Sequence, residues 1–176
     1  MLDNGCGNGR LLTAIKDKDV KYIGIDNCSC LLDIAKERYN REFICANSLK
    51  LPFENDFFDK VFSIAVIHHI PSFKYREMFL KEMYRVLKKN GICCISSWKN
   101  VSNKYMPFMG KFYLDKGDYF VPFKNEKGKL MGTRYVHVFE MDELEKLCLS
   151  VGFEIIKKGI TQAKGKERNI YFVLRK

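Results

Sequence analysis

Apolar and amphipathic segments alternate along the first half of the chain. Apolar runs suited to strands lie at residues 1–3, 22–26, 42–47, 60–67 and 91–98. Apolar positions at helical spacing lie between them, at 9–17, 29–40 and 74–89. We expect Ser29 to cap the second of these helices and Asn90-Gly91 to end the third. Alternating strands and helices of this length predict a doubly wound, mostly parallel α/β sheet.

The run at 60–67 is nearly continuous in apolar residues, which is typical of a strand buried on both faces. The alternation breaks at residues 99–139, which carry eight Lys or Arg against three Asp or Glu, with aromatic residues interleaved. A long irregular segment is usually functional, so we expect a substrate-recognition insert here. Regular structure resumes with a helix at 141–153 and strands at 154–160 and 169–176. The short linker between these strands predicts a hairpin and an antiparallel last strand.

The length of 176 residues suits a single domain over 1–176. The apolar runs are too short to span a bilayer, and the N-terminus lacks signal-peptide form. We therefore expect a cytoplasmic or nuclear protein with no membrane partner. Seven cysteines without a C-x-x-C pair are expected to be reduced, buried thiols, and no metal site is expected.

The net charge of +10 is unevenly distributed. Residues 1–98 hold 15 basic and 12 acidic side chains, a balance of +3, whereas residues 99–176 hold 16 and 9, a balance of +7. A basic excess in one half favours a polyanionic partner, nucleic acid first. A lysine-rich surface without any partner is an equal alternative on charge alone.

The stretch "LDNGCGNGRLL" (2–12) places Gly5, Gly7 and Gly9 between an expected strand and an expected helix. Glycines in that position let the backbone approach a nucleotide-like ligand. Their spacing differs from the dinucleotide motif and from the phosphate-binding loop. A carboxylate at Asp3 suits a ligand with an ammonium group, and Asp26, at the end of the second strand, can accept both ribose hydroxyls.

At the end of the third strand, Asn47 and Ser48 could meet an adenine edge. A ligand with an ammonium group, a ribose and an adenine, but no pyrophosphate, is S-adenosylmethionine. We predict it as the cofactor; the alternative is a tight turn in another α/β protein. The predicted cofactor site also includes Cys6, Asn8, Asn27 and Ala65.

Two further clusters are candidates for catalysis. His68 and His69 follow the fourth strand, and adjacent residues on an extended chain point to opposite faces, so we expect one imidazole in the pocket. Arg134 and His137 form the second cluster, where a guanidinium would suit a carboxylate substrate. The alternatives are a hydrogen-bonded structural histidine, and an arginine that contacts RNA phosphate or is merely exposed.

The segments "SLKLPFENDFFDKVFSIAVIHHI" and "FLKEMYRVLKKNG" resemble class I S-adenosylmethionine-dependent methyltransferases. More narrowly, "DNGCGNG", "SIAVIHHI", "DYFVPF" and "TRYVHVFEMDELEKL" together resemble the eukaryotic tRNA wobble-uridine carboxymethyl methyltransferases. The resemblance implies a Rossmann-like fold and methylation of the carboxylate of 5-carboxymethyluridine to its ester. A carboxylate needs little help from a base, so catalysis would be mostly alignment.

The resemblance also implies residue roles. Asp3 and the three glycines would hold the methionine end of the cofactor, and Asp26 its ribose. Substrate would be bound by Arg134, Tyr135, His137 and Trp98, with catalytic roles for His68, His69, Arg134 and His137. Two positions depart from the family pattern: Asn47 replaces the usual Asp, and Asn4 replaces an apolar residue.

The partners implied are a tRNA anticodon stem-loop and a small zinc-binding activator subunit. The 99–139 insert, with Lys164, Lys166 and Arg168, would follow the RNA, and the activator would pair with edge strand 42–47. Relatives carry a further N-terminal segment that this sequence lacks, so either residues precede Met1 in the natural protein or this cover is reduced. The alternatives are a small-molecule methyltransferase, acting for example on a quinone precursor, and a non-catalytic cofactor-binding scaffold.

Overall fold

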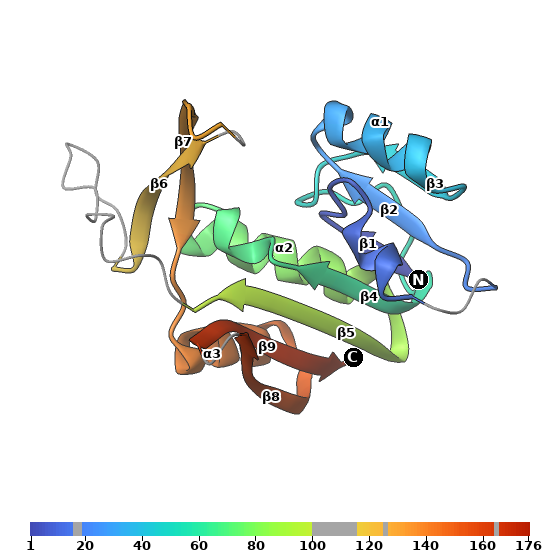
Figure 1. The fold of residues 1–176 in the computed structure, drawn as a ribbon. Helices are drawn as coiled ribbons and strands as arrows, with labels where there is room; N and C mark the ends of the chain where they lie inside the picture. Colours follow the sequence, from blue (N-terminus) through green and yellow to red (C-terminus); the bar gives the residue numbers. More distant parts are fainter. Residues whose placement is uncertain (16–18, 100–115, 125–126, 164–165) are drawn as a thin grey trace.

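The main sheet has the strand order β3-β2-β1-β4-β5-β9-β8 (Figure 1). The computed structural model describes residues 1–15, 19–99, 116–124, 127–163 and 166–176. The strands of this sheet are β1 (Leu2–Asn4), β2 (Ile23–Asp26), β3 (Glu42–Cys45), β4 (Phe58–Ile64), β5 (Leu87–Trp98), β8 (Glu154–Ala163) and β9 (Lys166–Arg175). The helices are α1 (Ser29–Arg38), α2 (Phe73–Val86) and α3 (Met141–Val151), with 3-10 turns η1 (Arg10–Thr13) and η2 (Ile67–His69).

Strands β1 to β5 pair in parallel, whereas β9 runs antiparallel to both β5 and β8. The predicted fold class, a mostly parallel doubly wound sheet with an antiparallel last strand, is therefore confirmed. Strand β3 lies at one edge, as predicted for residues 42–47. The carboxyl ends of the parallel strands meet at one side of the sheet, which is where such sheets bind ligands.

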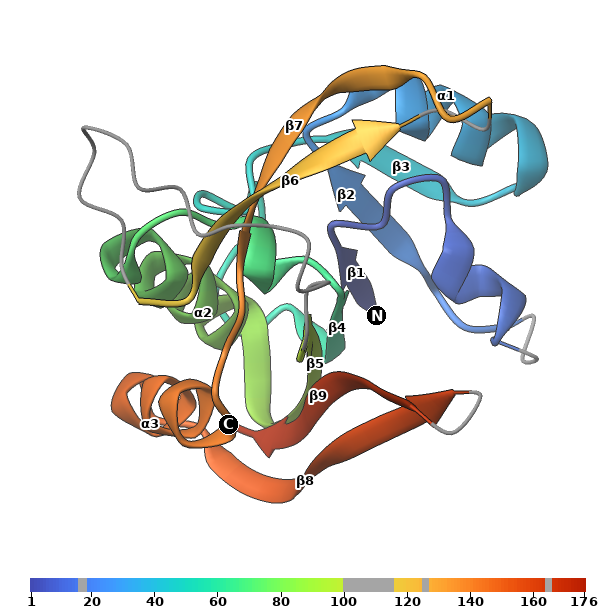
Figure 2. The ribbon, with the colours of Figure 1, turned by 60° about the vertical axis from the view of Figure 1, so that its left-hand side comes forward.

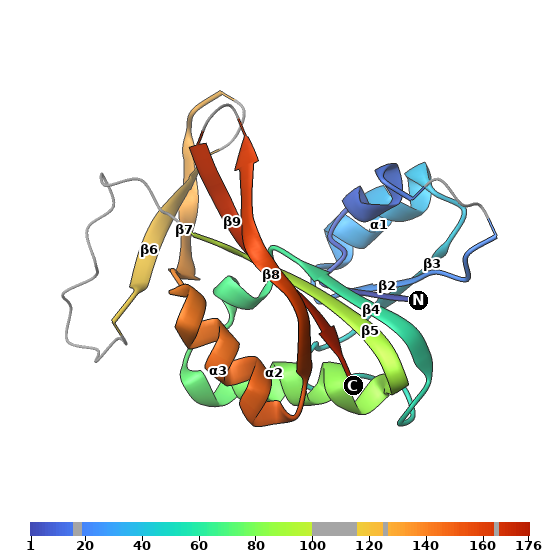
Figure 3. The ribbon, with the colours of Figure 1, turned by 90° about the horizontal axis from the view of Figure 1, so that it is seen from below.

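Helices pack on both faces of the sheet (Figure 3). Helices α2 and α3 cover one face, where Val61, Phe79, Leu147 and Phe172 belong to the large core. On the other face, α1 buries Leu32 and Ala35 against a smaller core formed with Cys6, Tyr22 and Phe43. Among the described residues, no helix is long and apolar enough to cross a membrane.

Several predicted boundaries were wrong. The helix expected at 9–17 is only the four-residue turn η1, which buries none of its residues and so has no packing to extend it; residues 16–18 lie outside the described part. Ser29 is the first helical residue of α1 rather than its cap, which is Cys28. Helix α2 ends at Val86, because Leu87 is extended and fully buried in β5.

Strand β4 is buried mainly on one face, not on both. Phe58, Val61 and Ser63 are buried, whereas Lys60 and Ile64 are exposed. The reason is that α2 and α3 cover only the face toward which Val61 points.

Part of the segment expected to be irregular is a hairpin. Strands β6 (Asp118–Lys124) and β7 (Leu130–His137) pair antiparallel, with Phe120 opposite Tyr135. Residues 100–115 and 125–126 of the predicted insert lie outside the described residues. The hairpin projects beyond the carboxyl ends of the parallel strands (Figures 1 and 2). It can therefore contribute side chains to a site at that edge.

Candidate active site

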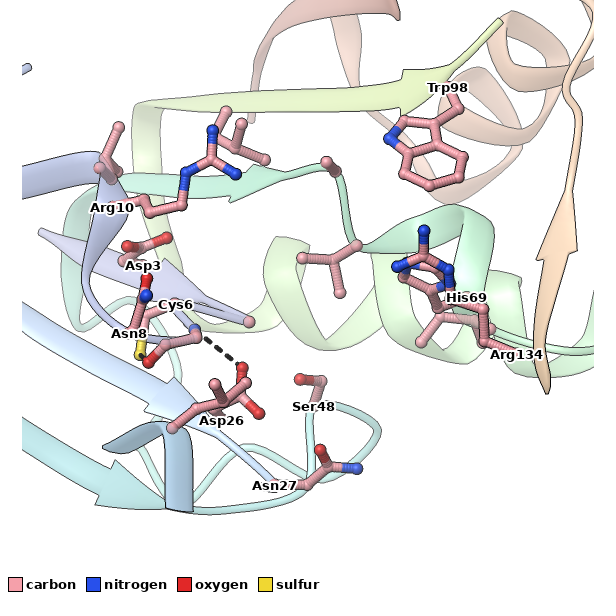
Figure 4. Close-up of a pocket in the computed structure, with 18 of the residues that line it drawn as sticks. Asp3, Cys6, Asn8, Arg10, Asp26, Asn27, Ser48, His69, Trp98 and Arg134 are labelled. Atoms are coloured by element: carbon pink, nitrogen blue, oxygen red, sulfur yellow. Dashed lines mark hydrogen bonds between the residues drawn. The ribbon is translucent and has the colours of Figure 1, made fainter. Parts of the chain in front are cut away.

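A cavity of about 1110 Å³ lies at the carboxyl ends of β1, β2, β4 and β5. Figure 4 shows its two ends, with Asp3 and the glycine loop on one side and His69, Trp98 and Arg134 on the other. Of the predicted cofactor residues, those that line it are Asp3, Gly5, Cys6, Gly7, Asn8, Asp26, Asn27, Asn47, Ser48 and Ala65. Gly9 is not in this lining.

The glycine loop turns sharply against the sheet. Gly5 and Gly7 have φ values of 83° and 53°, in the left-handed region that favours glycine. The backbone N–H groups of Gly5 and Cys6 both donate to the carbonyl of Ile25, each at 2.9 Å. A Cβ at Gly5 would lie 2.4 Å from Cγ2 of Val66. Only glycine therefore allows the loop to lie this close to the turn after β4.

The carboxylate of Asp26 is held in a fixed orientation. The backbone N–H of Gly7 donates to Oδ2, and that of Cys28 donates to Oδ1, both at 2.9 Å (Figure 4 marks the first of these bonds). Each carboxylate oxygen keeps a further lone pair for a ligand. A pair of vicinal hydroxyls is the natural ligand for a carboxylate oriented in this way.

Asp3 is the most buried acid of the cavity, with 2% of its surface exposed. Burial raises the pKa of this carboxyl to about 6, although the hydroxyl of Tyr22, which donates to it at 2.7 Å, acts in the opposite direction. Within the described chain, no Lys or Arg forms an ion pair with Asp3. A cationic ligand would supply the missing positive charge.

Asn47 and Ser48 line the cavity from the loop after β3. The side-chain oxygen of Asn47 accepts a hydrogen bond from the backbone N–H of Leu49 at 2.9 Å, which closes a local turn. The side-chain amide of Asn47 and the hydroxyl of Ser48 are therefore the groups of this pair best placed to meet a planar ligand.

Trp98 lies at the other end of the cavity, where it contacts both His68 and Arg134. The imidazole of His68 stacks on the indole with ring centroids 4.7 Å apart, and the guanidinium carbon of Arg134 lies 4.8 Å from the indole centroid. Nε of Arg134 is buried and has no hydrogen-bond partner among the described residues. A cation with an unpaired donor at the edge of a cavity is suited to an anionic group.

Of His68 and His69, only one lines the cavity, as predicted, but the predicted reason was wrong. They lie on the 3-10 turn η2 rather than on extended chain. His68 is fully buried, and burial lowers its pKa to about 2, so it is neutral and outside the cavity lining. His69 lines the cavity, and burial lowers its pKa as well. Its Nδ1 donates to the carbonyl oxygen of Tyr135 at 3.0 Å, which leaves Nε2 as an acceptor.

Two predicted substrate residues, Tyr135 and His137, do not line the cavity. The hydroxyl of Tyr135 donates to Asp118 at 2.5 Å, and His137 is 1% exposed, with Nδ1 2.5 Å from Asp118 and Nε2 2.8 Å from Glu143. The prediction for these two residues was wrong because successive residues of a strand point to opposite sides. Arg134 faces the cavity, whereas Tyr135 and His137 point into this network.

Sequence reasoning missed several residues of the site. Arg10 and Asn169 line the cavity, and Arg76 and Asp118 organise the buried network behind it. Arg10 could have been found from its place directly after the glycine motif. The other three are brought to the site only by tertiary contacts.

The cysteines are not all buried, contrary to expectation: Cys30 and Cys45 are exposed. The sulfurs of Cys28 and Cys30 lie 2.9 Å apart. Among the described residues, no group of three or more His, Cys, Asp or Glu side chains could hold a metal ion.

The strand order β3-β2-β1-β4-β5-β9-β8, with β9 antiparallel, a glycine loop after β1 and an acid at the end of β2, is the arrangement of a class I methyltransferase. Residues 2–95 match the family described as "Methyltransferase domain". A candidate methyltransferase of Encephalitozoon cuniculi is 31% identical over all 176 residues, which cover 78% of that protein. The chain therefore belongs to the methyltransferase family.

Other relatives match a shorter part of the chain. The tRNA (carboxymethyluridine(34)-5-O)-methyltransferase of Xenopus tropicalis is 42% identical over 96 residues, 54% of this chain and 15% of that protein. The enzyme of the same name from Arabidopsis thaliana is 30% identical over 118 residues, 64% of this chain and 28% of that protein. The chain thus spans less than a third of the length of these two relatives.

Solved structures agree on the fold. A methyltransferase from Methanosarcina mazei superposes with a TM-score of 0.78 over 99% of this chain and 91% of that one, at 22% identity. A Burkholderia thailandensis methyltransferase solved with bound S-adenosylhomocysteine gives a TM-score of 0.71 over 99% and 69% of the two chains, at 17% identity.

S-adenosylmethionine is the cofactor of this family, and the residues present fit it. Asp3 has no cationic partner among the described residues and would receive the ammonium group of the methionine part of the cofactor. Asp26 is already oriented to accept two hydroxyls, and the left-handed loop leaves room where a Cβ would collide with a neighbour.

Proposed function

We propose that this protein transfers a methyl group to the carboxylate of 5-carboxymethyluridine at the wobble position of tRNA, giving the methyl ester. The observation that carries the proposal is the position of Arg134. It lines the cavity at the end away from Asp3, with its guanidinium over Trp98 and with no hydrogen-bond partner for its buried Nε in the part of the chain that the structure describes. A guanidinium in this position can hold a substrate carboxylate beside the methyl donor.

The relatives support the same substrate. Two proteins named tRNA (carboxymethyluridine(34)-5-O)-methyltransferase share 42% and 30% of residues with the matched parts of this chain. These matches cover 54% and 64% of the chain, so the substrate is inferred from them together with the chemistry of the cavity.

When bound, S-adenosylmethionine supplies a methyl group on a sulfonium, a strong leaving group. In the proposed reaction Asp3 and Asp26 orient the cofactor, and Arg134 holds one oxygen of the substrate carboxylate. The other oxygen remains free as the nucleophile, because a guanidinium that gripped both oxygens would lower their nucleophilicity. His69, neutral and hydrogen-bonded to the hairpin, excludes water without needing to accept a proton.

The hairpin is the proposed RNA-binding surface. Its exposed side chains combine apolar and aromatic groups with lysines: Phe120, Phe123, Leu130, Met131, Lys124, Lys127 and Lys129. Lysines supply contacts to phosphates, and an unstacked base can lie on an aromatic ring. A cytoplasmic location remains a prediction.

We further propose that β3 pairs with a small zinc-binding activator subunit. An edge strand presents unpaired backbone groups that a partner strand can complete. Co-expression with such an activator should then increase the soluble yield. A monodisperse, fully active protein without it would contradict this part of the proposal.

The decisive experiment is methyl transfer from labelled S-adenosylmethionine to total tRNA, with and without the activator. Because esters saponify, mild alkali should release the label from the RNA. Alkali-stable label would rule out the ester. Cofactor binding without any transfer, even with the activator present, would favour a non-catalytic scaffold.

A second candidate rests on His69. Its Nε2 is an acceptor on a neutral ring that lines the cavity, which suits removal of a proton from a hydroxyl substrate. This favours a small-molecule methyltransferase. Transfer to a phenolic acceptor, abolished in His69→Phe, would support it, whereas the carboxylate reaction should persist in that variant.

A further inference from the structure

We propose that Arg76, acting with Asp118, is a positioning residue that sets the tautomer of His69 and the place of Arg134 at the cavity. Neither Arg76 nor Asp118 lines the cavity. Both act through the hairpin, which carries Arg134 and the carbonyl that contacts His69.

Arg76 connects three parts of the molecule from a site on α2 where it is 1% exposed. Its Nε donates to the carbonyl of Ile70, in the segment between η2 and α2, at 3.0 Å. Its Nη2 donates to Oδ1 of Asp118 on β6 at 3.1 Å and lies 2.5 Å from the hydroxyl of Tyr135 on β7. One guanidinium therefore joins α2 to both strands of the hairpin.

Asp118 gathers the same parts from the hairpin side. Its Oδ1 accepts a hydrogen bond from Nη2 of Arg76 and another from the hydroxyl of Tyr135, the second at 2.5 Å. Nδ1 of His137 lies 2.5 Å from the same oxygen. His137 continues the network to Glu143 on α3 through Nε2 at 2.8 Å. The base of the hairpin is thus held against both helices by directional bonds, which fix its orientation more closely than apolar packing alone.

The network reaches the cavity through the backbone of β7. The side chain of Tyr135 points into the network, while its carbonyl oxygen accepts from Nδ1 of His69 at 3.0 Å. A carbonyl can only accept, so this bond places the proton of the neutral ring on Nδ1 and leaves Nε2 as an acceptor. Arg134, the preceding residue, is positioned by the same segment.

Stability alone does not explain the cluster. A buried ion pair often stabilises a protein no more than apolar residues of the same size. Here the ion pair between Arg76 and Asp118 belongs to a network that joins α2, α3 and the hairpin. The network lies directly behind His69 and Arg134, which line the cavity. A small movement of the hairpin would change the hydrogen bond of His69 and the place of Arg134 together, and misplacement of about 1 Å can slow a reaction about a hundredfold.

The test compares Arg76→Gln with Arg85→Gln. Arg85 lies on the same helix and makes an equally extensive network with Glu82, Asn55 and the carbonyls of Leu51 and Phe53, away from the cavity. In Arg76→Gln we expect nitrogen NMR shifts of His69 to show a mixture of tautomers, S-adenosylhomocysteine affinity within about twofold of wild type, and transfer slowed about thirtyfold or more. In Arg85→Gln the His69 shifts and the transfer rate should be unchanged.

A folded Arg76→Gln protein with the wild-type tautomer of His69 would overturn the proposal, as would equal losses in Arg85→Gln. If Arg76→Gln does not fold, Tyr135→Phe decides: it removes a single hydroxyl and should shift the His69 signals in the same direction, and no shift would refute the coupling. Arg76→Lys should recover part of the transfer rate. The transfer measurements depend on the proposed function, whereas the NMR measurements do not, so the two can fail separately.

Discussion

Replacing Asp3 with Asn should stabilise the ligand-free protein while weakening its hold on the cofactor. Burial raises the pKa of Asp3 from 3.8 to about 6, so the folded state favours the protonated carboxyl. The stabilising contribution of that protonated form is complete below pH 3.8 and is lost as the pH rises through about 6. A pKa difference of this size corresponds to about 3 kcal/mol at neutral pH.

Asparagine keeps the shape of Asp3 and an oxygen that can accept from the hydroxyl of Tyr22. We therefore expect Asp3→Asn to raise the free energy of unfolding by ~1–3 kcal/mol at pH 7.5, with the difference disappearing near pH 4. Urea unfolding at both pH values measures this. Asp59→Asn, at an exposed ion pair with Lys88, is the matched control and should change little. A variant less stable than wild type at pH 7.5 would refute the reasoning.

The affinity for cofactor should change in the opposite direction. Protonation of Asp3 removes the partner of the ligand ammonium, so wild-type affinity for S-adenosylhomocysteine should fall about tenfold between pH 7.5 and pH 5. Asp3→Asn should bind about 10- to 100-fold more weakly at pH 7.5 and show no such pH dependence. Calorimetry with 5′-methylthioadenosine, which lacks the ammonium group, should show neither effect. Equal affinity of both proteins for S-adenosylhomocysteine would exclude Asp3 from the ammonium site.

Three other outcomes follow from the site. Gly5→Ala should lower the free energy of unfolding by ~2 kcal/mol more than Gly128→Ala, because both glycines have positive φ but only the Cβ at Gly5 meets Val66; similar midpoints of urea unfolding would contradict this. Arg10→Gln should weaken the binding of S-adenosylhomocysteine but not that of 5′-methylthioadenosine, since Arg10 is the cation beside the glycine loop that could meet the ligand carboxylate. Equal losses of affinity for the two ligands in calorimetry would exclude that contact. Arg134→Ala should slow methyl transfer to tRNA about thirtyfold or more, with cofactor affinity unchanged; a parallel fall in affinity would show that Arg134 serves the cofactor instead.

The glycine-loop end of the cavity was predictable because its signals are local. Asp3, the glycines and Asp26 lie at the ends of adjacent parallel strands, and strand-end residues of such strands converge wherever the sheet forms. The exception is Gly9, the last glycine of the motif, which packs against Tyr39 and does not line the cavity. The last helix and the antiparallel final strand followed from periodicity and a short linker in the same way.

The end of the cavity at Trp98 was only partly predictable. Arg134 lines the cavity, but its neighbours Tyr135 and His137 belong to a buried network. The sequence does not predict the pairing of β6 with β7, because this pairing depends on cross-strand contacts and on anchoring to α2 and α3, neither of which has a local signature. The contacts of Arg76 with Asp118 and Tyr135 have no local signature for the same reason.

The sequence by itself thus determined the sheet, the family and the strand-end residues that line the glycine-loop end of the cavity, because short-range patterns encode strand ends and glycine turns. Only the tertiary structure decided which histidine faces the cavity, which side of β7 presents Arg134 to the cavity, and how Arg76 and Asp118 hold that strand in place. These outcomes depend on contacts between residues far apart in the chain, and the order of residues alone does not specify the distances between them.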